Sequence, residues 1–253
     1  MNTAIVSSHI QREPELLEQT VVVIGGSAGI GLETARRASA EGAKLILTGR
    51  SPEPLQRTAS EVHALSTAAF DATDPALLKQ FFRDLPTSID HIMVTAGRPS
   101  YGRLIDLDLA HARRALDEHF SLFIEVARNA AEKVKAGGTL IFMGGTGARR
   151  PSIGFGIAST LIAALPALTA NLALELAPVR VNLIAAGFVD TQLSASLLGD
   201  ELEKRRSQLR AKLLIRRVVQ PADVAALAVH IMTNTALTGA TYDVDGGQQF
   251  VAA

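Results

Sequence analysis

Short apolar runs alternate along the chain with longer segments whose apolar positions recur at helical spacing. Most runs show no polar–apolar alternation, which is typical of strands buried on both faces of a parallel sheet. Seven runs predict strands: Thr20–Ile24, Lys44–Thr48, Thr67–Phe70, His91–Val94, Thr139–Met143, Arg180–Ile184 and Thr241–Val244. Six segments predict helices: Gly29–Ala40, Glu53–Ala64, Pro75–Asp84, Leu107–Lys135, Ile157–Ala177 and Pro221–Met232. This order predicts an α/β fold with a seven-stranded, doubly wound parallel sheet flanked by helices.

The predicted sheet occupies one domain, residues 19–253, because no proline-, glycine- or serine-rich linker divides the chain. Residues 1–18 are a polar N-terminal lead-in. The helical and strand patterns loosen over residues 191–217, directly after the sixth strand. An insertion at the carboxyl edge of such a sheet often covers the substrate, so we expect a lid there.

A glycine-rich segment joins the first strand to the first helix and reads Gly-Gly-Ser-Ala-Gly-Ile-Gly over residues 25–31. Glycine permits a tight turn and lets the backbone approach a pyrophosphate, while free N–H groups at the start of the helix attract phosphate. The alternative is a glycine-rich connection without a ligand. The position between strand and helix favours a Rossmann dinucleotide site, with these contacts to the cofactor: Gly25, Ser27, Gly29, Ile30 and Gly31.

The end of the second strand indicates which dinucleotide is bound. An NAD site has a carboxylate about 20 residues after the glycine turn, where it holds the ribose hydroxyls. Gly49 occupies that place here, and Arg50 follows it. A guanidinium can bind a 2′-phosphate and stack on adenine, so Arg50 favours NADP(H) over NAD. The alternative for Arg50 is a solvated surface arginine.

The next two strand ends add further cofactor candidates. Asp71 follows the third strand, beside Ala72, and is placed to accept a hydrogen bond from the adenine amino group. Thr95, Ala96 and Gly97 follow the fourth strand, where the backbone can lie against the adenine ribose. Each of these residues is also a plausible ordinary turn residue.

Together with three later motifs, these features resemble the short-chain dehydrogenase/reductase family from about residue 19 to 250. The motifs are Arg180-Val181-Asn182, Gly187-Phe188-Val189-Asp190-Thr191 and Asp243-Val244-Asp245-Gly246-Gly247. The resemblance implies a Rossmann fold, a homodimer or homotetramer, and a small-molecule substrate. It also implies that Val189 and Thr191 contact the nicotinamide carboxamide and a nearby phosphate, and that Gly144 lies against the cofactor.

The family's reaction uses a tyrosine as acid/base, a lysine four residues further on, a serine and an asparagine, because the alkoxide formed by hydride transfer must gain a proton. Counted back without gaps from residues 172–177, the tyrosine position falls on Ala158 and the lysine position on Ile162. The serine position falls on Gly145 and the asparagine position on His119. The resemblance therefore implies that the catalytic tetrad is absent.

The absence of a Tyr-x-x-x-Lys pair does not depend on that alignment. The chain has two tyrosines, Tyr101 and Tyr242, and neither has a lysine four residues later. No lysine occurs between Lys135 and Lys204.

Other residues are candidates for the missing chemistry. His119, with a near-neutral reference pKa, and Tyr101, after the fourth strand, are the two candidate proton donors; their alternatives are a packed histidine and a loop tyrosine that covers the site. Thr146 can replace the serine, unless its glycine-rich surroundings are simply an open turn. Arg149 and Arg150 either bind an anionic substrate or are solvated charges.

Composition narrows the possible partners. Lysine plus arginine and aspartate plus glutamate number 25 each, so no net charge attracts nucleic acid or an acidic membrane surface. No cysteine is present, no metal-ligand cluster stands out, and the N-terminus lacks a signal-peptide pattern. These features predict a cytoplasmic location. The segment Ile157–Ala177 is apolar on nearly every face, so we expect it to pack with Leu107–Lys135 in a homo-oligomer.

Two functions remain open on the sequence alone. The first is an NADP(H)-dependent oxidoreductase with a non-standard proton donor, acting on an imine, an activated alkene or an unusual carbonyl compound. The second is a catalytically inactive NADP(H)-binding sensor or oligomer partner. The first is favoured by the family resemblance.

Overall fold

The seven expected strands form one parallel sheet in the computed structural model, which describes residues 13–251. The strands are β1 (Thr20–Ile24), β2 (Lys44–Gly49), β3 (Ser66–Ala69), β4 (Ile89–Val94), β5 (Val134–Gly145), β6 (Arg180–Ala186) and β7 (Thr241–Val244). Their order is β3-β2-β1-β4-β5-β6-β7, and every adjacent pair is parallel. The order reverses between β1 and β4, which is the place where doubly wound sheets bind ligands. The predicted fold class is confirmed.

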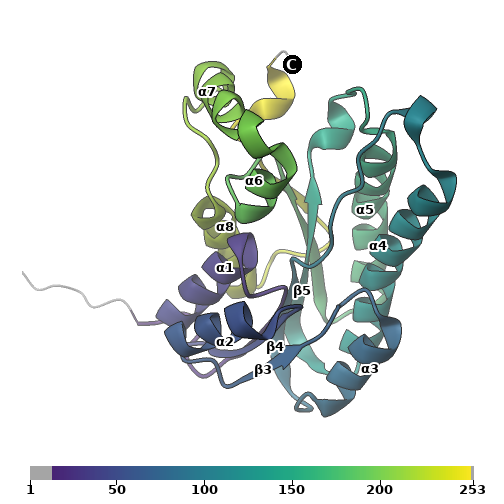
Figure 1. The fold of residues 1–253 in the computed structure, drawn as a ribbon. Helices are drawn as coiled ribbons and strands as arrows, with labels where there is room; N and C mark the ends of the chain where they lie inside the picture. The colour runs from purple at the N-terminus through teal and green to yellow at the C-terminus, as the bar shows by residue number, and fades with distance from the viewer. Residues whose placement is uncertain (1–12, 252–253) are drawn as a thin grey trace, which may run out of the picture.

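Helices cover both faces of the sheet (Figure 1). They are α1 (Gly29–Ala40), α2 (Pro52–Glu61), α3 (Pro75–Asp84), α4 (Leu109–Ala130), α5 (Gly156–Glu175), α6 (Gln192–Leu198), α7 (Leu202–Lys212) and α8 (Pro221–Thr233). Short 3₁₀ turns add η1 (Leu104–Asp106), η2 (Gly147–Arg149), η3 (Gly199–Glu201) and η4 (Gln248–Phe250). Helices α1, α2 and α8 lie on one face, and α3, α4 and α5 lie on the other.

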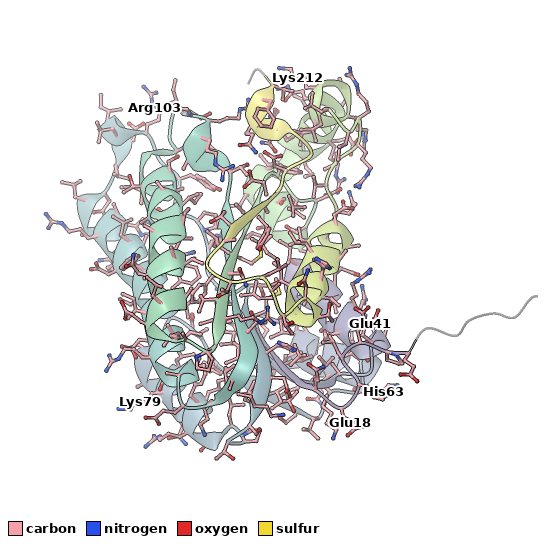
Figure 2. The ribbon with its side chains drawn as sticks, turned by 180° about the vertical axis from the view of Figure 1, so that it is seen from behind. Glu18, Glu41, His63, Lys79, Arg103 and Lys212 are labelled. Atoms are coloured by element: carbon pink, nitrogen blue, oxygen red, sulfur yellow. The ribbon has the colours of Figure 1, made fainter. Side chains whose placement is uncertain are left out.

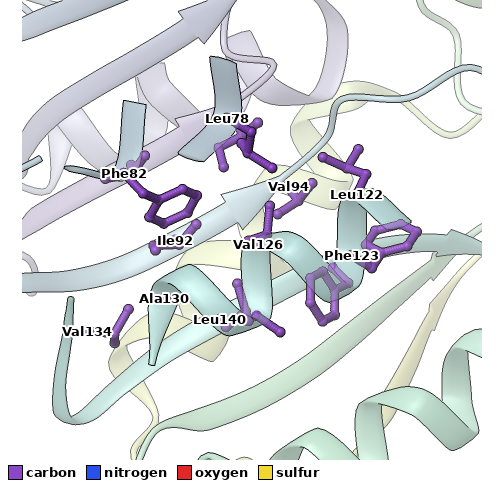
Figure 3. Packing of buried hydrophobic residues seen from close by; sticks show 14 of the residues in the cluster. Leu78, Phe82, Ile92, Val94, Leu122, Phe123, Val126, Ala130, Val134 and Leu140 are labelled. Atoms are coloured by element: carbon purple, nitrogen blue, oxygen red, sulfur yellow. The ribbon is translucent and has the colours of Figure 1, made fainter. Parts of the chain in front are cut away.

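Two buried clusters, one on each face, hold these layers together. Neighbouring residues of a strand point to opposite faces, so Val22 and Ile24 belong to one cluster while Val21 and Val23 belong to the other. Figure 3 shows the first cluster, in which Phe123 and Val126 of α4 lie with Leu140 of β5. Because nearly every position of β1, β2, β4 and β6 is buried, these strands read as largely apolar runs.

Helix α4 is shorter than the sequence suggested, and the expected range Leu107–Lys135 is wrong at both ends. The Asp108 side chain accepts a hydrogen bond from the backbone N–H of Ala110 at 2.9 Å, so the helix begins at Leu109. It ends at Ala130, and β5 already begins at Val134. The predicted helix ran too far because β5 follows α4 after a short connection, and the sequence marks no clear boundary between them.

Helix α5 is the one helix within residues 13–251 that is long and apolar enough to cross a membrane by length and composition, with a mean hydropathy of 1.8. One of its sides packs on the sheet through Ala158, Leu161, Leu165 and Thr169. Its other side, which includes Leu174 at 80% exposure, is open in the single chain. The described chain leaves this outer side uncovered, and this is the side on which the sequence predicted a partner chain.

The strands all point toward the same end of the molecule, which carries η1, η2, α6, α7 and η4 (Figure 1). Figure 2 shows Arg103 and Lys212 at this end, while Lys79 and Glu18 lie at the opposite end. The carboxyl edge of the sheet is thus the edge at which a ligand site is expected.

Candidate functional site

Residues 25–31, which join β1 to the start of α1, form a tight glycine-rich turn that we call the glycine cradle. Gly25 has a φ of +99° and Gly29 a φ of +53°, in a region that favours glycine. A Cβ atom on Gly31 would lie 2.2 Å from the carbonyl oxygen of Gly25, so the turn and the helix touch at that point. Only a glycine at residue 31 allows this close approach.

The backbone N–H groups in the first turn of α1 have no side-chain acceptor within the described residues. Its N-cap residue is Ala28, no side chain caps the helix, and no acidic residue lies in its first turn. The first N–H groups of a helix need an acceptor, and the helix dipole favours an anion there. The cradle therefore fits a diphosphate, and Ser27, Gly29 and Ile30 lie along it.

Thr95, which directly follows β4, links that strand to the glycine cradle by hydrogen bonds. Its hydroxyl donates toward the backbone carbonyls of Ile24 and Gly25, at 3.2 and 3.0 Å. The N–H groups of Thr95 and Ala96 both donate to the Ile24 carbonyl, at 2.8 and 3.0 Å. The sequence singled out Thr95 as a cofactor contact but missed this positioning role, which no local pattern signals.

The end of β2 carries no acid of the kind that an NAD site uses. A Cβ atom on Gly49 would lie 2.8 Å from the hydroxyl oxygen of Ser27, so the Ser27 side chain already covers that position. Arg50 is exposed next to it, and no hydrogen bond or ion pair engages its guanidinium in the described part of the chain. This corner therefore offers a free positive charge and no carboxylate.

Asp71 lies within range of that charge. Its Oδ1 atom accepts hydrogen bonds from the N–H and hydroxyl of Thr73, at 3.0 and 2.8 Å. The hydrogen bond from the Thr73 backbone, helped by the Arg50 charge, lowers the pKa of Asp71 and keeps it ionised. Ala72 beside it is buried in the core. Asp71 thus has one oxygen committed to its own turn.

The residues after β6 approach the cradle from the other side. A Cβ atom on Gly29 would lie 3.4 Å from the methyl group of Thr191, which also caps α6 by accepting from the Ser194 N–H at 3.1 Å. Val189 is buried next to it. Gly144 lies on β5, paired with Ala185 of β6. The fold brings Gly29 and Thr191 together across 162 residues of sequence.

Apolar contact replaces polar chemistry at the positions that the resemblance assigned to the serine, the tyrosine and the lysine. A Cβ atom on Gly145 would lie 3.3 Å from the Cδ1 atom of Ile162, so the Ile162 side chain covers Gly145. Ala158, one turn earlier in α5, is only 3% exposed. No titratable group stands at any of these three positions.

His119 lies directly against the end of β4. A Cβ atom on Gly97 would lie 2.6 Å from the Cε1 atom of its imidazole, and its ring contacts Phe123 with centroids 5.4 Å apart. Burial lowers the pKa of His119, which makes the imidazole neutral at pH 7. The side chain that the resemblance placed at the asparagine position is therefore at the carboxyl edge, next to a predicted cofactor contact.

Tyr101 is held in the loop that follows. Its ring packs on Phe155 with centroids 4.8 Å apart, and the Gly102 N–H donates to the Gly154 carbonyl at 2.9 Å. Partial burial raises the pKa of Tyr101, so its hydroxyl stays protonated. The contact places Tyr101 beside the segment that leads into α5.

Two other sequence candidates, Thr146 and Arg149, are held by hydrogen bonds within the chain. Thr146 is 3% exposed, and its N–H donates to the Ala186 carbonyl at 3.0 Å. The Arg149 guanidinium pairs with Asp243 and donates to the side chain of Gln249 at 2.8 Å, so it is neither free nor merely solvated. Within the part of the chain that the structure describes, no group of three or more metal-ligating side chains occurs.

Residues 191–217 form an ordered cap of α6, η3 and α7 rather than an irregular loop. The cap has its own small core of Leu209, Leu213 and Val218, with Phe188 packed against it. Arg206 on α7 also donates to Asp190 at 2.7 Å. These contacts join the cap to the end of β6.

Known proteins resemble this chain over nearly its whole length. A family model described as enoyl-(acyl carrier protein) reductase matches residues 25–249. The short-chain dehydrogenase/reductase ATR9 of Stachybotrys chlorohalonatus is 26% identical over 92% of this chain and 98% of its own.

Two solved structures with similar folds are complexes with NADPH. A small-chain dehydrogenase is 26% identical, with a TM-score of 0.79, over 92% of this chain and 99% of its own. BdcA is 25% identical, with a TM-score of 0.82, over 92% of this chain and 95% of its own. With the family match, the sheet order and the glycine cradle, the chain belongs to the short-chain dehydrogenase/reductase family.

Proposed function

We propose that this protein is an NADP(H)-dependent oxidoreductase whose proton donor differs from the tyrosine of its family. The observation that carries the cofactor assignment is the corner formed by Ser27, Gly49 and Arg50, where no carboxylate stands and where no residue within 13–251 pairs with the guanidinium. The two NADPH complexes among its structural relatives support the same assignment.

The residues present fit this cofactor. The open N–H groups of α1 and the glycine cradle would hold the diphosphate, and Arg50 would hold the 2′-phosphate. Asp71, Ala72, Ala96 and Gly97 would border the adenosine. Gly144, Val189 and Thr191 would border the nicotinamide half. When bound, the reduced nicotinamide supplies a hydride.

The reaction also requires a proton donor. Reduction of a carbonyl or an imine adds a hydride to carbon and a proton to the heteroatom. Neither Gly145, Ala158 nor Ile162 can donate one, whereas His119 and Tyr101 both carry a donor near the carboxyl edge. His119 is favoured because it touches Gly97, and Tyr101 is the second candidate.

Such a site suits a substrate that needs little acid assistance. An imine that is already protonated gains only the hydride. An activated alkene gains the hydride at carbon, and its electron-withdrawing group carries the resulting charge until solvent protonates it. We therefore expect imines, activated alkenes or an unusual carbonyl compound as substrates, rather than simple ketones.

A panel of ketones, imines and enones, with NADPH oxidation as the readout, tests this function. We expect an imine or an enone to be reduced at least about tenfold faster than matched ketones, since general acid catalysis contributes a factor of at least about 100 where it operates. Simple ketones reduced as fast as the other classes would contradict the proposal.

One observation favours a second function. The contact between Ile162 and Gly145 fills the space that a substrate-polarising group would occupy. A protein of this kind can bind NADP(H) without turnover and act as a sensor or an oligomer partner. Tight NADPH binding with no oxidation by any substrate in the panel would favour this second function.

We also propose that the chain forms a homodimer or homotetramer through α4 and α5. The support is the exposed outer side of α5, where four alanines and Leu174 stand beside Thr160, Asn171 and Glu175. Light scattering at micromolar concentration would contradict this if it found a monomer.

Three further assignments stay predictions. Residues 191–217 serve as a substrate lid, residues 19–253 form one domain, and the protein is cytoplasmic, without a nucleic-acid or membrane partner. The predicted lead-in, residues 1–18, falls mostly outside the described residues.

A further inference from the structure

The turn that follows β7, residues 245–248, lies against the segment 187–191 that leaves β6. A Cβ atom on Gly187 would lie 2.8 Å from the Oε1 atom of Gln248, so the lack of a side chain at Gly187 allows a close approach. The same oxygen accepts a hydrogen bond from the backbone N–H of Phe188 at 2.8 Å, although the two residues are 60 positions apart in the sequence. The turn after β7 therefore holds the backbone that follows β6.

A buried carboxylate sets the position of Gln248. Asp245 is 5% exposed, and its two carboxylate oxygens accept hydrogen bonds from the N–H groups of Gly247 and Gln249, at 2.8 and 3.0 Å. The N–H of Gln248 donates to the backbone carbonyl of Asp245 at 3.0 Å. Burial of a charge is costly unless hydrogen bonds compensate it, so these bonds favour one shape of the turn. Gln248 thus presents its side-chain oxygen at a defined place.

The backbone beyond Phe188 leaves one donor unused. The N–H of Asp190 donates to the Val219 carbonyl at 3.0 Å, and Val189, which precedes Asp190, is 6% exposed. Within residues 13–251, no oxygen accepts a hydrogen bond from the Val189 N–H. Buried backbone N–H groups are nearly always paired, so this one is expected to pair with a ligand. Under the proposed function Val189 borders the nicotinamide half, whose carboxamide carries a suitable acceptor oxygen.

We propose that Gln248 is a positioning residue for the nicotinamide half of the cofactor. By accepting from the Phe188 N–H, it restricts the backbone dihedral angles that direct the next N–H, that of Val189, toward the carboxamide. The inference rests on the proposed function and adds to the same site a residue from the segment after β7. Gln248 acts through Phe188 and Val189 and need not touch the cofactor itself.

Calorimetry with two ligands tests this role without requiring turnover. One ligand is NADPH, and the other is adenosine 2′,5′-bisphosphate, which keeps the adenosine and the 2′-phosphate but lacks the nicotinamide half. Gln248→Leu removes the acceptor and keeps similar bulk. We expect the variant to bind NADPH about tenfold more weakly, and to bind the bisphosphate within about twofold of the wild-type affinity. A merely structural role would weaken the binding of both ligands alike.

Two further variants separate the hydrogen bond from the stability of the turn. Gln248→Asn withdraws the oxygen by one carbon and should show the same selective loss, even if the leucine variant does not fold. Gln248→Glu keeps an acceptor oxygen at the same reach and should retain most of the NADPH affinity.

The matched control is Gln249→Leu, in the same turn. The Gln249 side chain bonds to Arg149 and Asp243 at 2.8 and 2.9 Å, and no hydrogen bond joins it to residues 187–191. The affinities for both ligands should therefore stay unchanged in this variant.

The proposal is overturned if Gln248→Leu and Gln248→Asn bind NADPH as tightly as the wild type, or if they lose affinity for both ligands equally. It is also overturned if Gln249→Leu shows the same selective loss. Failure of NADPH to bind the wild-type protein at all is a different result, which contradicts the proposed function itself.

Discussion

The two halves of the sheet carry different kinds of residues at the carboxyl ends of their strands. In the first half, β1, β2 and β4 end in a glycine cradle, an unpaired arginine and a threonine that ties two strands together. In the second half, β5 and α5 meet through the contact of Gly145 with Ile162. The first half carries residues that fit a dinucleotide, while the positions that the resemblance assigns to the family's serine, tyrosine and lysine hold Gly145, Ala158 and Ile162 in the second half. This difference predicts that a substitution can change cofactor binding without changing proton transfer, and the reverse.

Restoring polar groups in the second half should have the largest effect on activity. The double variant Ala158→Tyr with Ile162→Lys should raise ketone reduction about 100-fold, the lower range of what general acid catalysis contributes. NADPH affinity should stay the same, because neither residue belongs to the cradle.

The matched control for the restored pair is Ala158→Phe with Ile162→Met, which adds similar bulk without a hydroxyl or an amine. Steady-state kinetics with a ketone panel compare the two double variants. Equal ketone rates in both would show that the missing polar groups are not what separates the two halves.

Damage to the first half should weaken cofactor binding. Gly31→Ala places a Cβ atom 2.2 Å from the Gly25 carbonyl oxygen, so the helix must move away from the turn. We expect NADPH affinity to fall about 100-fold, or about 2.7 kcal/mol, in calorimetry. Gly156→Ala is the control, because a Cβ atom there meets nothing within 4 Å. Unchanged affinity in Gly31→Ala would remove the cradle from the site.

The arginine after β2 should set the choice of cofactor. Arg50→Asp removes a charged hydrogen bond worth about 2 kcal/mol and puts a negative charge beside the 2′-phosphate. The ratio of NADPH to NADH affinity should therefore fall about 30-fold. Arg57→Gln, on an exposed arginine of α2, is the control. A ratio that does not move would make Arg50 a surface charge.

A smaller effect should identify the proton donor between the two halves. Burial holds the pKa of His119 below its usual 6.5, so the imidazolium accumulates only as the pH falls through that lowered value. If this form donates, the reduction rate should rise about tenfold on the acid side, and His119→Gln should flatten the profile.

Tyr101→Phe provides the comparison for that profile. Burial raises the pKa of Tyr101, so its hydroxyl remains protonated over the acid range and its loss should leave the slope intact. A profile that His119→Gln leaves unchanged and Tyr101→Phe lowers uniformly would assign the proton to Tyr101.

The sequence predicted the sheet well because burial on both faces leaves a direct pattern of apolar residues. It predicted the glycine turn for a similar reason, since the conformational need of Gly25 and Gly29 restricts the residue type. The start of α4 was missed because Asp108, which caps the helix, stands between Leu107 and Leu109, so apolar residues lie on both sides of the boundary. Local pattern thus defines elements better than their ends.

Contacts between distant segments were not predictable. The approach of Ser27 to Gly49 depends on how far apart β1 and β2 lie, and the contact of Ile162 with Gly145 depends on the rotation of α5. These features need three-dimensional coordinates.

The binding of nicotinamide cofactors by the wild-type protein tests the central claim most directly. Calorimetry should detect NADPH binding at least about tenfold tighter than NADH binding, as expected for a site that pairs a guanidinium with the 2′-phosphate. Absence of measurable heat with NADPH, NADP⁺, NADH and NAD⁺ alike would contradict the account.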